Sequence, residues 1–314
     1  MSTSGRPALE DYGLLIMLAA IWGGSFLFIK LAVDTIPAAT LTAARLVIAV
    51  LFMLAVMKAI GARWPRGMAT WGIIALAALF GNALPFTLIS WGEEAIDSGT
   101  AAILMAVMPL TTVLLAHIAT SDEKLNARKA IGVCLGLVGL VVLIGPEKLT
   151  LLGNETIRQL AVAAAAMCYG VNALAMKWLI GEERYGLVTA IMVASVVMMV
   201  PYSLAVDQPW TLGPSVGSIW ATIVLGLLQT AIGTLIMFAI VRRQGASFFS
   251  QVNFLIPLFG VAWGALFLSE ALPGDAFVAL SLILLGIAIA RGGHGLVRRS
   301  PPTKPPVAPS PKHL

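Results

Sequence analysis

The sequence predicts an all-α membrane protein in which ten transmembrane helices form two inverted repeats of five. Three observations support this prediction: an extreme apolar composition, a regular series of apolar segments, and residues that recur at a nearly constant spacing. Of the 314 residues, 59% are hydrophobic and only 11% are charged, whereas soluble domains are roughly 45–50% apolar and about 25% charged. The composition therefore excludes an ordinary water-soluble globule.

Apolar segments of membrane-spanning length follow one another along most of the chain. A spanning helix needs about 20 apolar residues, and its backbone must be helical because lipid offers no partner for an open N–H or C=O group. The first segment lacks a small-residue cleavage site, so we expect it to be a retained helix rather than a signal peptide. The expected spans are residues 13–33, 38–57, 70–91, 97–119, 128–145, 158–179, 186–206, 217–241, 246–268 and 275–292.

The composition changes beyond the last span. Residues 293–314 are rich in proline and poor in large apolar side chains, a composition that does not build a packed core. We expect this segment to be a disordered tail on the cytoplasmic side.

The distribution of basic residues predicts the orientation. An even number of spans places both termini on one side, and cytoplasmic loops carry an excess of Lys and Arg. With both termini in the cytoplasm, the opposite side holds only Lys30, Lys148 and Arg158, and Arg45 lies within a span. The cytoplasmic side then holds Arg6, Lys58, Arg63, Arg66, Lys124, Arg128, Lys129, Lys177, Arg184, Arg242, Arg243, Arg291, Arg298, Arg299, Lys304 and Lys312.

An internal repeat divides the chain into residues 1–146 and 147–292, with five spans in each half. The matched positions are Trp22-Gly23 with Tyr169-Gly170, Lys30 with Lys177, Glu123 with Glu270, Gly139 with Gly286, and Pro109 with Pro257. Because five is odd, the second copy must enter the membrane in the opposite orientation. Inverted repeats are typical of alternating-access transporters, whose substrate sites lie near the midplane between the repeats.

Several short motifs lie on this repeat. Residues 20–26 (AIWGGSF) precede Lys30 and Arg45, and residues 98–102 (SGTAA) precede Pro109. Residues 122–125 (DEKL) precede Gly139, while residues 245–247 (GAS) and 269–272 (SEAL) repeat the pattern in the second half. Over residues 10–292 the chain resembles the EamA family of the drug/metabolite transporter superfamily, and within it the bacterial inner-membrane exporters of aromatic and neutral amino acids. Position 192, opposite Arg45 in the repeat, departs from the pattern because it is Met.

The resemblance implies a transporter in the bacterial inner membrane that exports small solutes or lets them pass. Amino acids and related metabolites are the expected substrates, and the expected partners are the solute and the lipid bilayer, with no nucleic acid. One inverted-repeat chain supplies both halves of a pathway, so a monomer is sufficient. A multidrug or cationic-metabolite exporter is the alternative within transporters, and a non-transporting membrane scaffold is the alternative of another class.

No enzymatic activity and no cofactor are expected. The sequence holds neither a phosphate-binding G-x-x-x-x-G-K-[ST] loop nor a G-x-S-x-G nucleophile motif, and the S-x-x-K match at Ser121–Lys124 lies in a charged turn. Cys134 and Cys168 sit in apolar runs and do not form a metal-site pattern.

Acidic residues fall at span ends or in loops, and Glu93 and Glu94 come closest to membrane depth. A solvated loop position is the expected interpretation for both, because charges are costly in lipid. Since ion relays generally use an intramembrane carboxylate, we expect a facilitator that moves solute down its gradient.

Polar, aromatic and thioether side chains on the spans predict a substrate pocket. Apolar walls with a few convergent polar groups are the usual form of such sites. For the amides the alternative role is interhelical hydrogen bonding, and for the aromatic rings it is plain packing. The candidate substrate-binding residues are Trp22, Asn82, Met105, Met108, Tyr169, Asn172, Gln229, Gln251 and Asn253.

Helix-breaking residues predict gates on the third, fourth, eighth and ninth spans. A proline removes one backbone hydrogen bond and tends to kink its helix. Pro109 and Pro257 are repeat-related, and Gly233 is the counterpart of Pro85. Arg45 lies about 10 Å inside the second span at 1.5 Å per residue; it either snorkels to the interface or serves as an outer-gate residue or carboxylate anchor. Two G-x-x-x-G patterns, 132–136 and 260–264, are expected to pack within the chain rather than to form a dimer face.

Overall fold

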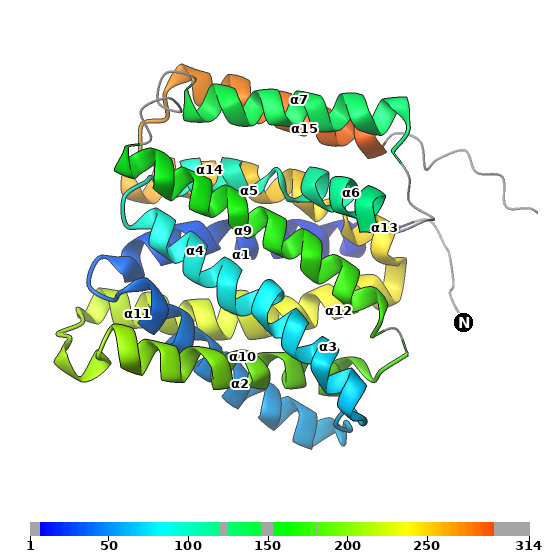
Figure 1. The fold of residues 1–314 in the computed structure, drawn as a ribbon, viewed down its shortest axis with the longest axis vertical. Helices are drawn as coiled ribbons and strands as arrows, with labels where there is room; N and C mark the ends of the chain where they lie inside the picture. The colour runs from blue at the N-terminus through cyan, green and yellow to red at the C-terminus, as the bar shows by residue number, and fades with distance from the viewer. Residues whose placement is uncertain (1–6, 120–124, 146–152, 180, 292–314) are drawn as a thin grey trace, which may run out of the picture.

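The computed structural model describes residues 7–119, 125–145, 153–179 and 181–291, and these form a bundle of long helices (Figure 1). The first half contains α1 (Leu9–Val33), α2 (Ala38–Ile60), α3 (Met68–Ala78), η1 (Leu79–Ala83), α4 (Leu84–Glu93), α5 (Ser98–Met105), α6 (Met108–Ala119) and α7 (Ala127–Ile144). The second half contains α9 (Asn154–Lys177), α10 (Arg184–Val206), η2 (Pro209–Thr211), α11 (Val216–Val224), η3 (Leu225–Ile232), α12 (Gly233–Gln244), α13 (Ala246–Phe249), α14 (Val252–Leu268) and α15 (Gly274–Arg291).

Nine helical segments of the described ranges are long and apolar enough to cross a membrane, and they match nine of the ten expected spans. The tenth, Gly274–Ala290, is apolar but shorter. Large apolar side chains lie exposed on outer helix faces, among them Leu51, Ile118, Val197 and Leu266. Such faces suit contact with lipid rather than water.

Equivalent helices of the two halves run in opposite directions. α1 begins at the end of the bundle where α9 finishes (Figure 1). We call this the basic end, because the helix termini and loops there carry Lys58, Arg63, Arg66, Arg128, Lys129, Lys177, Arg184, Arg242 and Arg243. At the opposite end the described cations are Lys30 and Arg158. The expected charge asymmetry is therefore present in the described part of the chain.

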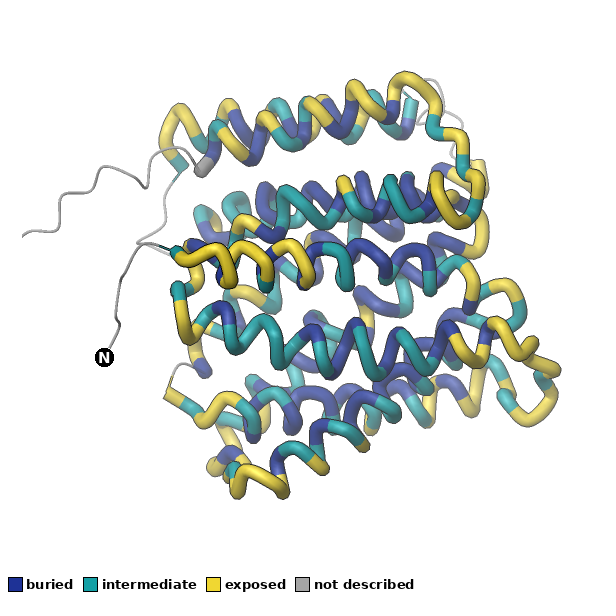
Figure 2. Tube along the Cα trace, turned by 180° about the vertical axis from the view of Figure 1, so that it is seen from behind, coloured by how far each residue is buried: buried dark blue, intermediate teal, exposed yellow. Residues whose placement is uncertain are grey.

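The buried faces of the helices meet along the middle of the bundle, while the exposed residues concentrate at its ends and outer faces (Figure 2). One buried cluster joins both halves: Phe26, Ile29 and Ile89 of the first half pack with Ala165 and Leu225 of the second. The two repeats therefore share a core.

Glycines allow the two halves to pack closely. A Cβ added at Gly23 of α1 would lie 2.8 Å from the carbonyl oxygen of Ile256 in α14, and one at its repeat partner Gly170 of α9 would lie 2.7 Å from a methyl group of Leu115 in α6. The first helix of each repeat thus packs on the fourth helix of the other.

Both G-x-x-x-G patterns pack within the chain, as expected. A Cβ added at Gly132 would lie 2.5 Å from the carbonyl oxygen of Gly286 in α15, and one at Gly260 would lie 2.4 Å from Cβ of Ala102 in α5.

Four helices are irregular, and they are the four on which gates were expected. The third span contains the π-helical segment η1, and the eighth contains η3. Such π-turns are frequent at functional sites. The fourth span is interrupted between α5 and α6, and the ninth between α13 and α14. Pro109 follows the first interruption directly, whereas Pro257 lies inside α14.

Candidate functional site

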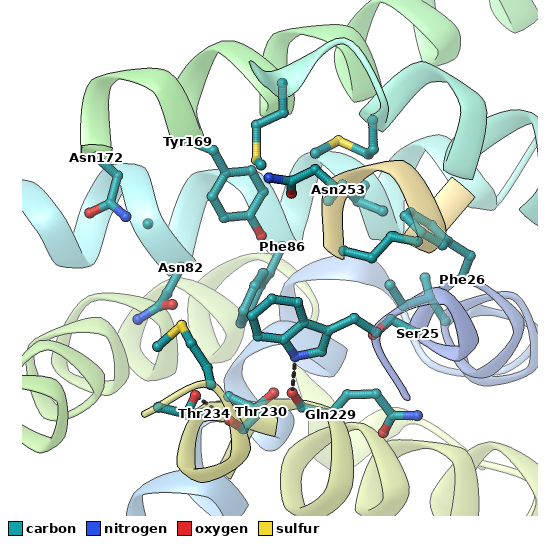
Figure 3. Close-up of a pocket in the computed structure, with 18 of the residues that line it drawn as sticks. Ser25, Phe26, Asn82, Phe86, Tyr169, Asn172, Gln229, Thr230, Thr234 and Asn253 are labelled. Atoms are coloured by element: carbon teal, nitrogen blue, oxygen red, sulfur yellow. Dashed lines mark hydrogen bonds between the residues drawn. The ribbon is translucent and has the colours of Figure 1, made fainter. Parts of the chain in front are cut away.

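A cavity of about 450 Å³ lies between the two halves of the bundle. Its wall draws on both repeats and includes the π-helical segments and the broken helices (Figure 3). Ile29 of α1 and Ile89 of α4 lie toward the opposite end, and we call them the floor; the wall reaches toward the basic end through Thr234, Met237 and Phe249.

Most of the candidate substrate-binding residues come together in this wall. The residues that line it are Trp22, Asn82, Met105, Met108, Tyr169, Asn172, Gln229 and Asn253, together with the candidate gating residues Arg45, Pro109 and Pro257. Pro85 and Gly233 are buried behind the wall. The expectation for Gln251 is wrong, because this side chain is exposed outside the cavity, in the turn between α13 and α14.

Arg45 is buried in the wall rather than extended to the interface. Its residue exposure is 6%, so the snorkelling alternative is wrong. Its Nε donates a hydrogen bond of 2.7 Å to Oγ1 of Thr230 in η3, and its guanidinium lies 3.9 Å from the ring centroid of Phe86. Both contacts hold the positive charge at one place in the cavity.

Arg45 is the charged residue of this wall, and the described wall residues include no Asp or Glu. A buried charge without an ion-pair partner is costly. The cavity is therefore suited to a ligand that brings a negative group to Arg45.

Two polar candidates are engaged with the protein itself. The indole Nε1 of Trp22 donates a hydrogen bond of 3.0 Å to the backbone oxygen of Gln229, the contact dashed in Figure 3. Gln229 is almost fully buried, and its side-chain Oε1 has no hydrogen-bond partner among the described residues. Asn82 donates a hydrogen bond of 3.0 Å to Oγ of Ser195, which is interhelical, although Asn82 also lines the cavity.

Repeat symmetry continues inside the cavity. Residues 147 positions apart face it in pairs: Trp22 and Tyr169, Ser25 and Asn172, Arg45 and Met192, Asn82 and Gln229. The third pair is asymmetric in charge, because only the first half places a cation at this position.

Sequence reasoning missed part of the wall. Ser25, Phe86, Thr230 and Thr234 also line the cavity (Figure 3). Ser25 lies in the same short motif as Trp22, and Thr230 follows Gln229 directly. Their small hydroxyls gave no distinctive signal, because Ser and Thr occur in membrane helices without any role in binding.

The expectation that Glu93 is a solvated loop residue is wrong. Glu93 is the last residue of α4 and is 0% exposed. Glu94 is exposed and pairs with Arg158 at 2.6 Å. Lys30 lies at the same end, where its Nζ donates to the backbone oxygens of Glu93 and Ile96 at 2.8 and 2.9 Å, so it caps the last turn of α4.

The described residues contain neither a candidate metal site nor a disulfide. No group of three or more His, Cys, Asp or Glu there is placed to hold a metal ion, and Cys134 and Cys168 are both free. Four sequence features lie outside the described residues: Ser121–Lys124, Glu123 of the repeat, Lys148, and the proline-rich segment 293–314.

The sequence matches the model of the EamA-like transporter family twice, over residues 12–145 and 157–292. The chain belongs to this family. The two matches correspond to the two halves of the bundle, so the duplicated EamA repeat accounts for the related helices around the cavity.

Relatives of this EamA-like chain carry transporter names. It is 28% identical over 280 residues to the "Probable terminal-alkyne amino-acid exporter" of Streptantibioticus cattleyicolor, covering 88% of this chain and 91% of that protein. It is 25% identical to the "Probable amino-acid metabolite efflux pump" of Escherichia coli, covering 89% and 94%. It is 27% identical to the "S-adenosylmethionine/S-adenosylhomocysteine transporter" of Chlamydia trachomatis, covering 90% and 89%.

A solved crystal structure shares the fold. It superposes with a TM-score of 0.62 at 20% sequence identity and covers 93% of this EamA-like chain and 99% of the other. The EamA-like family and the apolar helices establish a multi-pass membrane transporter.

Proposed function

We propose that this EamA-like transporter moves amino acids, aromatic or neutral ones above all, across the bacterial inner membrane by alternating access of the cavity between its repeats. Ten spans in an inverted five-plus-five arrangement would form the pathway, with both termini and the basic end in the cytoplasm. The chain would work as a monomer.

One observation carries the substrate class: Arg45 is buried in the cavity wall and no described wall residue is acidic. A guanidinium fork matches the geometry of a carboxylate. The α-amino group would meet neutral oxygens of Ser25, Asn82 or Asn172, and the rings of Phe86 and Tyr169 and the nearby methionines would surround the side chain. Two of the relatives quoted above are named for amino acids, which supports the same class.

A multidrug or cationic-metabolite exporter is less well supported. Sites for cations generally present a carboxylate, whereas the charge on this wall is positive. A non-transporting scaffold would need neither the cavity nor the irregular helices.

Counterflow in liposomes tests the proposal. Purified protein is loaded with one unlabelled amino acid, and uptake of a radiolabelled one is competed with amino acids, their carboxamides, cationic drugs and sugars. Arg45→Met should weaken competition by the amino acid about tenfold or more, the equivalent of about 1.5–3 kcal/mol for a hydrogen bond to a charged group. It should leave competition by the carboxamide almost unchanged.

The matched control is Met192→Leu, at the position equivalent to Arg45 in the second repeat, which keeps an apolar wall. Competition by drugs but by no amino acid, or equal loss of acid and carboxamide recognition in Arg45→Met, would contradict the proposed substrate class.

A further inference from the structure

Glu93 is a buried acidic side chain that the cavity wall does not use. It lies one helical turn beyond the floor residue Ile89, on the same face of α4. Its exposure is 0%, and neither carboxyl oxygen has a hydrogen-bond partner among the described residues. A group in this state calls for a physical explanation.

The two cations nearest to Glu93 are engaged elsewhere. Lys30 from α1 donates to the backbone oxygens of Glu93 and Ile96, not to the carboxyl group. The Nε of Arg45, from α2, donates a hydrogen bond to Oγ1 of Thr230. Both positive charges lie close enough to interact with Glu93 electrostatically, but neither forms an ion pair with it within 4.0 Å.

The other neighbouring charged groups do not neutralise Glu93. Arg158 from α9 donates to the backbone oxygen of Trp91 and pairs with Glu94. Glu270, after α14, is itself acidic and so cannot neutralise Glu93, and its carboxylate accepts three hydrogen bonds from Ser98 and Gly99. Asp97, before α5, is exposed to solvent.

Glu93 is enclosed at the opposite end of the bundle, where the helices of both repeats pack together: Val162 and Arg158 of α9 lie against Gly92, its neighbour in α4. Gly260 of α14 packs against Ala102 of α5, and Glu270 bonds the first residues of α5. Burying an ionised carboxylate without a partner is far more costly than burying the neutral acid. Closure of this end therefore favours the protonated side chain.

We propose that Glu93 is a proton-binding site whose occupancy is tied to closure of the opposite end. In the closed state the carboxyl group holds a proton on one oxygen. When α5 separates from α14, water reaches the group, its O–H bond ionises, and the proton passes to the solution on that side. The inference rests on the alternating access proposed above. A facilitator was expected because no carboxylate was predicted at membrane depth, and the buried Glu93 removes that reason.

The linkage between proton binding and closure sets how strongly closure depends on pH. If the closed state binds one proton more than the open state, the ratio of closed to open molecules falls about tenfold for each pH unit in the range where the open state is ionised. High pH at the opposite end should therefore open that end, and low pH should keep it closed.

The test measures accessibility of the closed end as a function of pH. Cys134 and Cys168 are replaced by Ala, and Ile96→Cys, whose native side chain is 4% exposed at this end, is labelled with a membrane-impermeant maleimide between pH 5.5 and 8.5. Each rate is divided by the rate for the detergent-denatured protein at the same pH, which removes the titration of the thiol itself. The expected result is a relative rate that rises with pH by tenfold or more.

Glu93→Gln should keep the relative rate low and flat, because a neutral amide mimics the protonated acid. The matched control Glu94→Gln, next in the chain and exposed, should rise like the parent protein. Glu93→Asp retains a titratable group, so its relative labelling rate should still rise with pH. This variant replaces Glu93→Gln in the test if Glu93→Gln fails to elute as a folded monomer. A flat profile in the parent protein, or a step that persists in folded Glu93→Gln, would overturn the proposal.

Counterflow of amino acids on the same preparations separates the two proposals. Intact counterflow with a flat accessibility profile overturns the proton site alone. A pH step with no counterflow of any amino acid overturns the proposed substrate and leaves the proton site supported.

Discussion

Glu270 caps the first turn of α5 at Ser98. One carboxylate oxygen accepts from the backbone N–H of Ser98 at 2.9 Å, and the other accepts from its hydroxyl at 2.9 Å and from the N–H of Gly99 at 3.0 Å. Ser269, in the left-handed conformation with φ 55°, ends α14 and turns Glu270 back toward the helix. The Glu270 side chain therefore links the second repeat to the first at the opposite end of the bundle, and it does so at a helix N-terminus, where negative charge is favoured.

Glu270→Gln should weaken closure of this end. The amide keeps the size of the side chain but removes its charge and one acceptor, and a charged hydrogen bond contributes about 1.5–3 kcal/mol. Labelling of Ile96→Cys at low pH should become about tenfold faster, while Asp275→Asn, a control in the exposed first turn of α15, should leave it unchanged. An equal effect of the two variants would show that Glu270 does not hold the end closed.

The spans could be predicted from the sequence because the bilayer imposes one rule on every segment: about 20 apolar residues with all backbone groups paired. The cavity wall could be predicted in large part because few polar residues occur at depth, so Asn82, Asn172 and Asn253 stand out. Repeat symmetry then indicated which helices bend.

Contacts between distant parts of the chain determine the features that could not be predicted from the sequence. Glu93 ends its helix, a position that usually meets water, but Lys30 of α1 and the side of α9 that carries Val162 cover that end here. For Arg45 the sequence left two alternatives open, because the contacts that hold it inside the bundle come from Thr230 and Phe86, which are distant in sequence. The π-helical segments had no local signal, because the chain around them is apolar almost throughout and offers little contrast that an extra residue could shift.

Gly23 provides a test of the close contact between the repeats. A Cβ at this position would lie 2.6 Å from Cβ of Phe259 and 2.8 Å from the backbone oxygen of Ile256. Because both are parts of a helix that packs tightly, Gly23→Ala should lower stability by about 1–3 kcal/mol, as overpacking does. The measurement is the apparent melting temperature in detergent, followed by tryptophan fluorescence.

The control for Gly23 lies on the same helix. Gly13 has open space at the position of a Cβ, so Gly13→Ala should raise stability slightly through the greater helix propensity of Ala, by up to about 1 kcal/mol. If both variants shift the melting temperature alike, α1 and α14 do not pack as described.

The repeat-related prolines test the role of the broken helices. Replacing Pro109 and Pro257 by Ala restores a backbone N–H donor in the fourth and ninth spans and should straighten them. Counterflow should then slow more than expression falls. Unchanged transport in both variants would exclude these prolines from the gating motion.

Asn82 has two roles to separate, since it lines the cavity and also donates to Ser195 at 3.0 Å. Ser195→Ala removes the interhelical hydrogen bond and leaves the amide in the wall, whereas Asn82→Ala removes both. If Asn82 contacts the substrate, Asn82→Ala should raise the half-saturating concentration for counterflow at least several-fold more than Ser195→Ala, as expected for one further net hydrogen bond of about 0.5–1.5 kcal/mol. Equal effects of the two substitutions would assign Asn82 to helix packing alone. In that case Asn172 and Ser25, which face the cavity from the two first helices of the repeats, would be left as the neutral groups that meet the amino end of the substrate.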